Sequence, residues 1–203
     1  MIEFERNETN RFLRVTVGCA ALTVLGACAS GADSGAMTVP VSPDMLVSDM
    51  SPARHAVAVG VVSGGEKTNP LWTSQVSNEN FKMALANSLE LAVLKGDAGA
   101  PYILNARLVS LHQPIMGFDM TVTSTVEYTL LPAGQTTPVL DETIVAPYTA
   151  NFSDALVAGE RLKLANEGAM RANIHEIIFR LIRAGDPGGK LSNTGPVRTS
   201  SLP

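Results

Sequence analysis

Alternation of apolar and polar residues is the clearest pattern in the chain, and it predicts four β-strands. From residue 118 to residue 130 the even positions are apolar apart from Ser124, and the odd positions hold threonines and acids. A period of two places alternate side chains on opposite faces of a strand, so this segment belongs to a sheet with one covered and one solvated face. Similar but weaker patterns predict strands over residues 57–62, 102–112 and 139–148.

Apolar residues at spacings of three and four predict two helices. Phe81, Leu85 and Leu89 follow Ser77, a residue type that caps helix N-termini well. A longer helix is expected over residues 153–183, because isoleucines and leucines recur at helical spacing in its last turns.

The resulting order is β-α-β-β-β-α, and the two helices must bury their apolar faces on the apolar face of the sheet. We therefore expect an α+β two-layer sandwich, with a four-stranded, mostly antiparallel sheet covered on one face by two helices. Residues 56–184 are the segment expected to fold this way, as one domain.

The first residues indicate export from the cytoplasm. Arg11 and Arg14 precede an uncharged run of thirteen residues, 15–27. A helix of that length spans about 20 Å, less than the bilayer core of about 30 Å. The run therefore has the size of a signal-peptide apolar region rather than of a membrane span.

The run ends in Leu25-Gly26-Ala27-Cys28, which resembles the lipobox of bacterial lipoproteins. The resemblance implies that residues 1–27 are a signal peptide and that Cys28 carries diacylglycerol and palmitate; a plain secretory signal and a chance match are the alternatives. Residues 28–55 are rich in Ser, Gly and Pro, so we expect a lipidated cysteine followed by a flexible tether. Residues 185–203 are expected to form a disordered tail.

Ala29 and Ser30 follow the cysteine. In the sorting rule that the lipobox resemblance brings with it, Asp at the first of these positions retains a lipoprotein at the inner membrane. We therefore expect anchoring at the periplasmic face of the outer membrane, with the inner membrane left open. Cys19 leaves with the signal peptide, so the mature chain keeps one cysteine, which the lipid consumes.

Charge and motifs argue against nucleic-acid and nucleotide partners. The chain has 15 basic and 19 acidic residues, a formal net charge of −4, and no basic cluster. The glycine-containing stretch 60–68 resembles a phosphate-binding loop only superficially, because Glu66 separates Gly65 from Lys67.

Catalytic and metal-binding patterns are equally weak. The three histidines do not pair at ligand spacing, and no Gly-x-Ser-x-Gly elbow occurs. Asp141 and Glu142 are neighbours on a predicted strand, so they should point to opposite faces. We expect no enzyme activity, no cofactor and no metal.

Two features are candidates for contact with a partner. The polar face of the third strand carries Thr121, Thr123 and Thr125, and it is either simply solvated or docks on another protein. Ile115 and Met116 lie in a turn where polar residues are expected. They either fold back onto the helices or form an exposed tip that inserts into lipid or a partner.

A lipobox, a Ser/Pro-rich segment and β-α-β-β-β-α with a long last helix resemble a group of small outer-membrane lipoproteins. The group includes the lipopolysaccharide-assembly lipoprotein, auxiliary lipoproteins of ABC-type lipid transport, and a small uncharacterised family. The resemblance implies an accessory or binding subunit of an outer-membrane assembly or lipid-transport complex, with a barrel or transport protein as partner. An activator of a peptidoglycan synthase and an envelope hydrolase are the alternatives.

Overall fold

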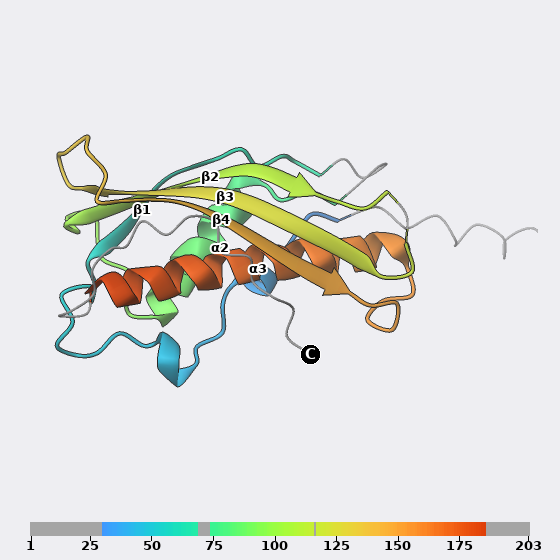
Figure 1. Cartoon of the computed structure of the whole chain (residues 1–203), viewed down its shortest axis with the longest axis horizontal. Helices are drawn as coiled ribbons and strands as arrows, with labels where there is room; N and C mark the ends of the chain where they lie inside the picture. Colours follow the sequence, from blue (N-terminus) through green and yellow to red (C-terminus); the bar gives the residue numbers. More distant parts are fainter. Residues whose placement is uncertain (1–29, 69–73, 116, 186–203) are drawn as a thin grey trace, which may run out of the picture.

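The protein folds as a four-stranded sheet with two helices on one face (Figure 1). The structure is a computed structural model that describes residues 30–68, 74–115 and 117–185. The predicted α+β sandwich and the predicted order of its strands and helices are confirmed. The elements are α1 (Ser34–Met37), η2 (Pro43–Met45), β1 (Val57–Ser63), α2 (Asn78–Leu91), β2 (Tyr102–His112), β3 (Met120–Pro132), β4 (Leu140–Ala150) and α3 (Ala158–Gly185).

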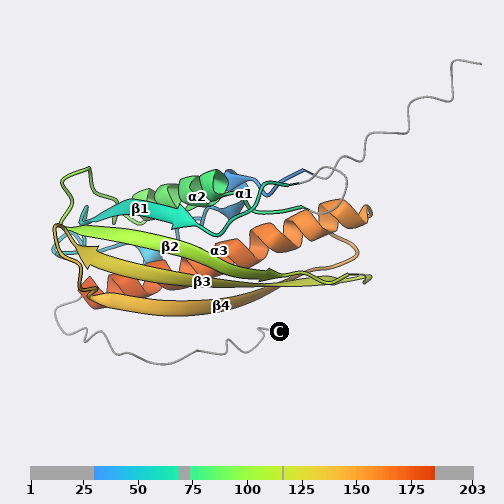
Figure 2. The same ribbon diagram turned by 90° about the horizontal axis from the view of Figure 1, so that it is seen from above.

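The sheet is mixed rather than mostly antiparallel. Its strands lie in the order β1-β2-β3-β4, as Figure 2 shows from above. β1 pairs with β2 in parallel, whereas β2–β3 and β3–β4 are antiparallel. The parallel pair arises because α2 is a crossover that returns the chain to the end of the sheet where β1 began.

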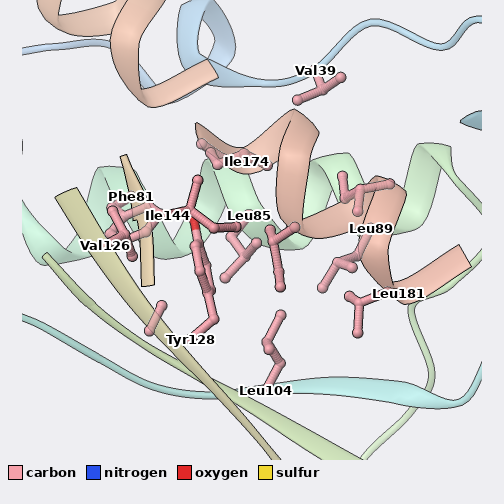
Figure 3. Packing of buried hydrophobic residues seen from close by; sticks show 14 of the residues in the cluster. Val39, Phe81, Leu85, Leu89, Leu104, Val126, Tyr128, Ile144, Ile174 and Leu181 are labelled. Carbon is pink, nitrogen blue, oxygen red and sulfur yellow. The ribbon is translucent and has the colours of Figure 1, made fainter. Parts of the chain in front are cut away.

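The core lies between the sheet and the helices. Leu104 on β2 and Tyr128 on β3 point from the sheet toward Leu85 of α2 and Ile174 of α3, and all four side chains are fully buried (Figure 3). The hydroxyl of Tyr128 has no hydrogen-bond partner among the described residues, and burial raises the pKa of its phenol. The alternation seen in the third strand therefore identifies its inward face correctly.

One polar contact inside the core explains the serine that interrupts this alternation. Asn173 of α3 is fully buried, and its Nδ2 donates to the carbonyl oxygen of Ile144 at 3.0 Å and to the Oγ of Ser124 at 3.2 Å. Ser124 Oγ donates in turn to the carbonyl oxygen of Ala169 at 3.0 Å. The pair therefore fixes α3 against both β3 and β4.

The segment predicted to be a flexible tether is instead packed on the domain. We call residues 30–55 the N-terminal strap; Met37 and Met45 in it have 0% and 2% exposed side chains. The composition of the strap suggested a solvated coil, but its apolar side chains extend the core beyond the helices. The predicted tether is therefore wrong from residue 30 onward, and so is a domain that begins at residue 56.

Side chains of both helices hold the strap in place. Asn80 Nδ2 of α2 donates to the carbonyl oxygen of Ala32 at 2.7 Å, and the backbone N–H of Asp33 donates to Glu167 Oε1 of α3 at 2.8 Å. Farther along, the backbone N–H of Val39 donates to Ser88 Oγ at 2.9 Å. The predicted signal peptide 1–27 and Cys28 lie outside the described residues; so does the predicted tail, except Gly185, which ends α3.

Candidate contact surface

Two loops meet at one end of the molecule. They are the β2–β3 connection, residues 113–119, and the β4–α3 connection, residues 151–157. The rings of Phe118 and Phe152 stack edge to face with their centroids 5.9 Å apart, and the backbone N–H of Phe152 donates to Asp119 Oδ1 at 2.9 Å. The two connections therefore form one surface, which lies at the right-hand end of Figure 1.

Large apolar side chains project from both loops. Ile115 is 97% exposed, Phe118 81% and Leu156 78%, and Phe152 is 45% exposed. A single exposed apolar residue is ordinary, but several on adjoining loops of one end suggest a contact site. We call these four residues the apolar end.

The predicted tip is only part of this surface. Ile115 stands out from the domain and does not fold back onto the helices, whereas Met116 lies outside the described residues. Phe118 was expected on the covered face of a strand, which is wrong because β3 begins only at Met120. Leu156 was expected inside the last helix, which begins five residues later than predicted, at Ala158.

Sequence reasoning missed the second loop of the surface. The helix expected over residues 153–183 includes positions that belong to the loop preceding Ala158. The usable signal was Gly159, which lies one residue inside the actual helix and weakens a helix interior. Leu156 could have been assigned to a loop on that basis, whereas Phe152 already lay between the predicted strand and the predicted helix.

Arg161, near the start of α3, stabilises the loop that carries Phe152 and Leu156. The guanidinium of Arg161 is buried and donates through Nη1 to the carbonyl oxygens of Ala155 and Leu156. It also lies 5.1 Å from the centroid of the Phe152 ring, within the range of a cation–π contact. These contacts hold the loop in shape and leave its apolar side chains outward.

The three predicted threonines lie on the sheet face that the helices do not cover. Thr121 is exposed, whereas Thr123 and Thr125 are half-buried, and Thr121 Oγ1 is 2.8 Å from Thr149 Oγ1. Their partners on β4 are all uncharged: Thr149, Pro147 and Val145. We call Thr121, Thr123, Thr125 and these partners the threonine face. Farther along the sheet the face becomes charged, with Arg107 and Glu127 paired at 2.7 Å.

Acidic and histidine side chains do not converge within the described ranges. No group of three or more His, Cys, Asp or Glu residues there could hold a metal ion. The predicted opposite orientation of Asp141 and Glu142 is confirmed, since Glu142 reaches Arg180 of α3 while Asp141 lies opposite Thr129. Over the same ranges, no helix has the length and apolar character needed to cross a bilayer.

The sequence of the chain matches neither a protein-family profile nor a curated protein at significant similarity. Its structure is similar to a Xanthomonas campestris protein of the DUF330 family, with a TM-score of 0.54 and 13% identity over 77% of this chain and 96% of that one. A weaker similarity is to a candidate lipoprotein of Caulobacter crescentus, with a TM-score of 0.44 and 12% identity over 64% of this chain and 90% of that one. Another is to a hypothetical protein of Chlamydia trachomatis, with a TM-score of 0.42 and 16% identity over 63% of this chain and 92% of that one. The chain thus shares the fold of a DUF330 protein.

Proposed function

We propose that this protein is a non-enzymatic lipoprotein of the bacterial envelope. It is anchored through acyl chains on Cys28 at the periplasmic face of the outer membrane, and it serves as an accessory or binding subunit of an outer-membrane assembly or lipid-transport complex. The lipobox Leu25-Gly26-Ala27-Cys28 supports the anchor. The observation that carries the binding role is the uncharged threonine face, which the helices leave open.

The threonine face suits a protein partner. Burying a charged side chain without a partner is costly, whereas hydroxyls and small apolar groups lose little on contact. Thr121, Thr149 and Val145 offer such groups on two neighbouring strands. The face therefore presents a surface on which a barrel or transport protein docks.

The packed strap argues against an activator of a peptidoglycan synthase. That role needs reach across the periplasm, and a free tether of about 25 residues would span roughly 90 Å when fully extended. Residues 30–55 are bound to the helices instead, so that length is not available as a linker.

The experiment is a pull-down of tagged, acylated protein from membranes in a gentle detergent, with identification of the proteins that co-purify. We expect a barrel or lipid-transport subunit in stoichiometric amount with the native chain, and its loss with Thr121→Arg. Thr136→Arg is the matched control, since Thr136 is an exposed threonine of the β3–β4 turn at the far end of the sheet.

A peptidoglycan synthase or a hydrolase as the stoichiometric partner would contradict the proposed role. If Thr121→Arg and Thr136→Arg lose the partner equally, the threonine face is not the surface that binds it. The anchor is tested independently: Cys28→Ser should abolish acyl-chain labelling, and unchanged labelling would refute the lipobox.

A further inference from the structure

We infer that the apolar end inserts into the membrane leaflet that holds the acyl chains of Cys28. This inference rests on the proposed anchor and adds an orientation to it: the domain stands with its apolar end on the lipid. Ile115, Phe118, Phe152 and Leu156 are the side chains that enter the leaflet, and they come from two separate loops.

The described chain begins at the same end of the fold. The backbone N–H of Ala32 donates to the carbonyl oxygen of Gln75 at 3.0 Å, and Gln113 Nε2 donates to the carbonyl oxygen of the adjacent Ser74 at 2.9 Å. Ala32 and Gln113 are thus linked through neighbouring residues, and Gln113 is two positions from Ile115. Figure 2 shows the start of the strap toward the end where β2 and β3 are joined.

The covalent chain limits how far this end can lie from the lipid. Cys28 precedes Ala32 by four residues, which reach about 14 Å at most when fully extended. Ala32 is fully buried and also accepts from Asn80, so it is fixed to the domain. Acyl chains on Cys28 therefore hold the end of the domain that carries Ile115 close to the membrane.

The opposite end of the strap lies at the other end of the fold. Near the end of the strap, Ser51 Oγ donates to the carbonyl oxygen of Gly185 at 3.2 Å, at the C-terminus of α3. Near its start, the backbone N–H of Asp33 donates to Glu167, which lies in the first half of α3. The strap thus runs along the helices away from the anchor. A free tether would have allowed any orientation, but a bound strap selects one.

The chemistry of the apolar end suits acyl chains rather than phosphate. Three charged groups at this end, Asp119, Asp154 and Arg161, hydrogen-bond to the backbone of the loops themselves. Contact with a leaflet therefore comes from burial of apolar side chains, with little dependence on salt or anionic lipid. The anchor makes this contact intramolecular, so even weak insertion is well populated.

A spin label tests the depth of the apolar end directly. The acylated mature chain keeps no free thiol in this account, so Ile115→Cys provides a single labelling site. Gln135→Cys, in the exposed β3–β4 turn at the other end of the sheet, is the control. Both proteins are placed in phosphatidylethanolamine–phosphatidylglycerol vesicles, and the accessibility of each label to oxygen and to a water-soluble nickel complex is measured.

We expect the label at position 115 to be more accessible to oxygen than to the nickel complex, as a site below the lipid phosphates is. The label at position 135 should be more accessible to the nickel complex. If the chain is acylated and bound to vesicles but both labels are more accessible to the nickel complex, the inferred orientation is wrong and the anchor still stands. An unmodified Cys28 on a chain that does not bind vesicles would instead refute the proposed function.

A second measurement separates lipid from protein as the occupant. The background for this measurement is the mature chain with Cys28→Ser, which carries no acyl chains. In that background, Phe118→Asp should lower the partition coefficient into the same vesicles on the order of tenfold, and so should Leu156→Asp. Val139→Asp, at a partly exposed site near the β3–β4 turn, should leave partition unchanged. If the variants at the apolar end keep vesicle partition but lose the co-purified protein, a protein surface occupies this end and the inference fails.

Discussion

Met37 tests whether the strap is part of the core. It lies in a segment whose composition is typical of a solvated coil, yet its side chain is fully buried. Met37→Ala removes three heavy atoms beyond Cβ and leaves a cavity under the strap. Truncation of a buried methionine to alanine lowers the free energy of unfolding by about 2–5 kcal/mol.

Met50 is the matched control, because it is the same residue type in the same strap with a 90% exposed side chain. Met50→Ala should change the free energy of unfolding by less than about 0.5 kcal/mol. For a domain of this size, the loss at Met37 corresponds to a fall in melting temperature of roughly 10 °C.

The assay is urea unfolding of the mature chain with Cys28→Ser, followed by circular dichroism, for both variants. The difference between the two variants isolates burial from any effect of methionine chemistry. Equal and small losses at the two positions would refute a docked strap, and the orientation inferred for the apolar end would lose its basis.

Three further changes probe the core and the surface, each by the same unfolding assay. Asn173→Ala should lower the free energy of unfolding by about 1–3 kcal/mol, because it leaves the carbonyl oxygen of Ile144 without this donor; no loss would show that the bridge is unimportant. Tyr128→Phe should leave stability unchanged or raise it, since the buried hydroxyl has no partner in the described structure, and a clear loss would reveal a missing contact. Ile115→Asp should shift stability by less than about 0.5 kcal/mol, whereas marked unfolding would place Ile115 in the core.

Elements with a strong period were predictable from the sequence. The second strand was placed at its observed bounds, residues 102–112, and the inward face of β3 was correct from Met120 onward. Both follow from local alternation, which a half-buried strand imposes on its own sequence. The parallel pairing of β1 with β2 is set by the path of α2 through space, which local pattern does not encode.

The strap was missed for a different reason. Its apolar residues, such as Met37, Val39 and Met45, follow no helical or strand period, because most of the segment is irregular and is held by contacts with distant residues. Its partners, including Asn80 and Glu167, lie far away in the sequence. Composition alone therefore favoured a solvated coil.

The contact surface was predictable only in part. Ile115 stood out because an apolar residue in a turn is unusual, and its exposure agrees with that interpretation. Phe118 and Leu156 were hidden by element boundaries that extended too far, and Phe152 joins them only through the stacking of two loops. The assembly of a surface from two loops is a property of the tertiary fold.

The most direct test of the lipoprotein account is the intact mass of the mature protein extracted from membranes. We expect a chain that begins at Cys28 and carries the added mass of a diacylglyceryl group together with an N-linked acyl chain. A mature chain that begins elsewhere, or one in which Cys28 is unmodified, would contradict it.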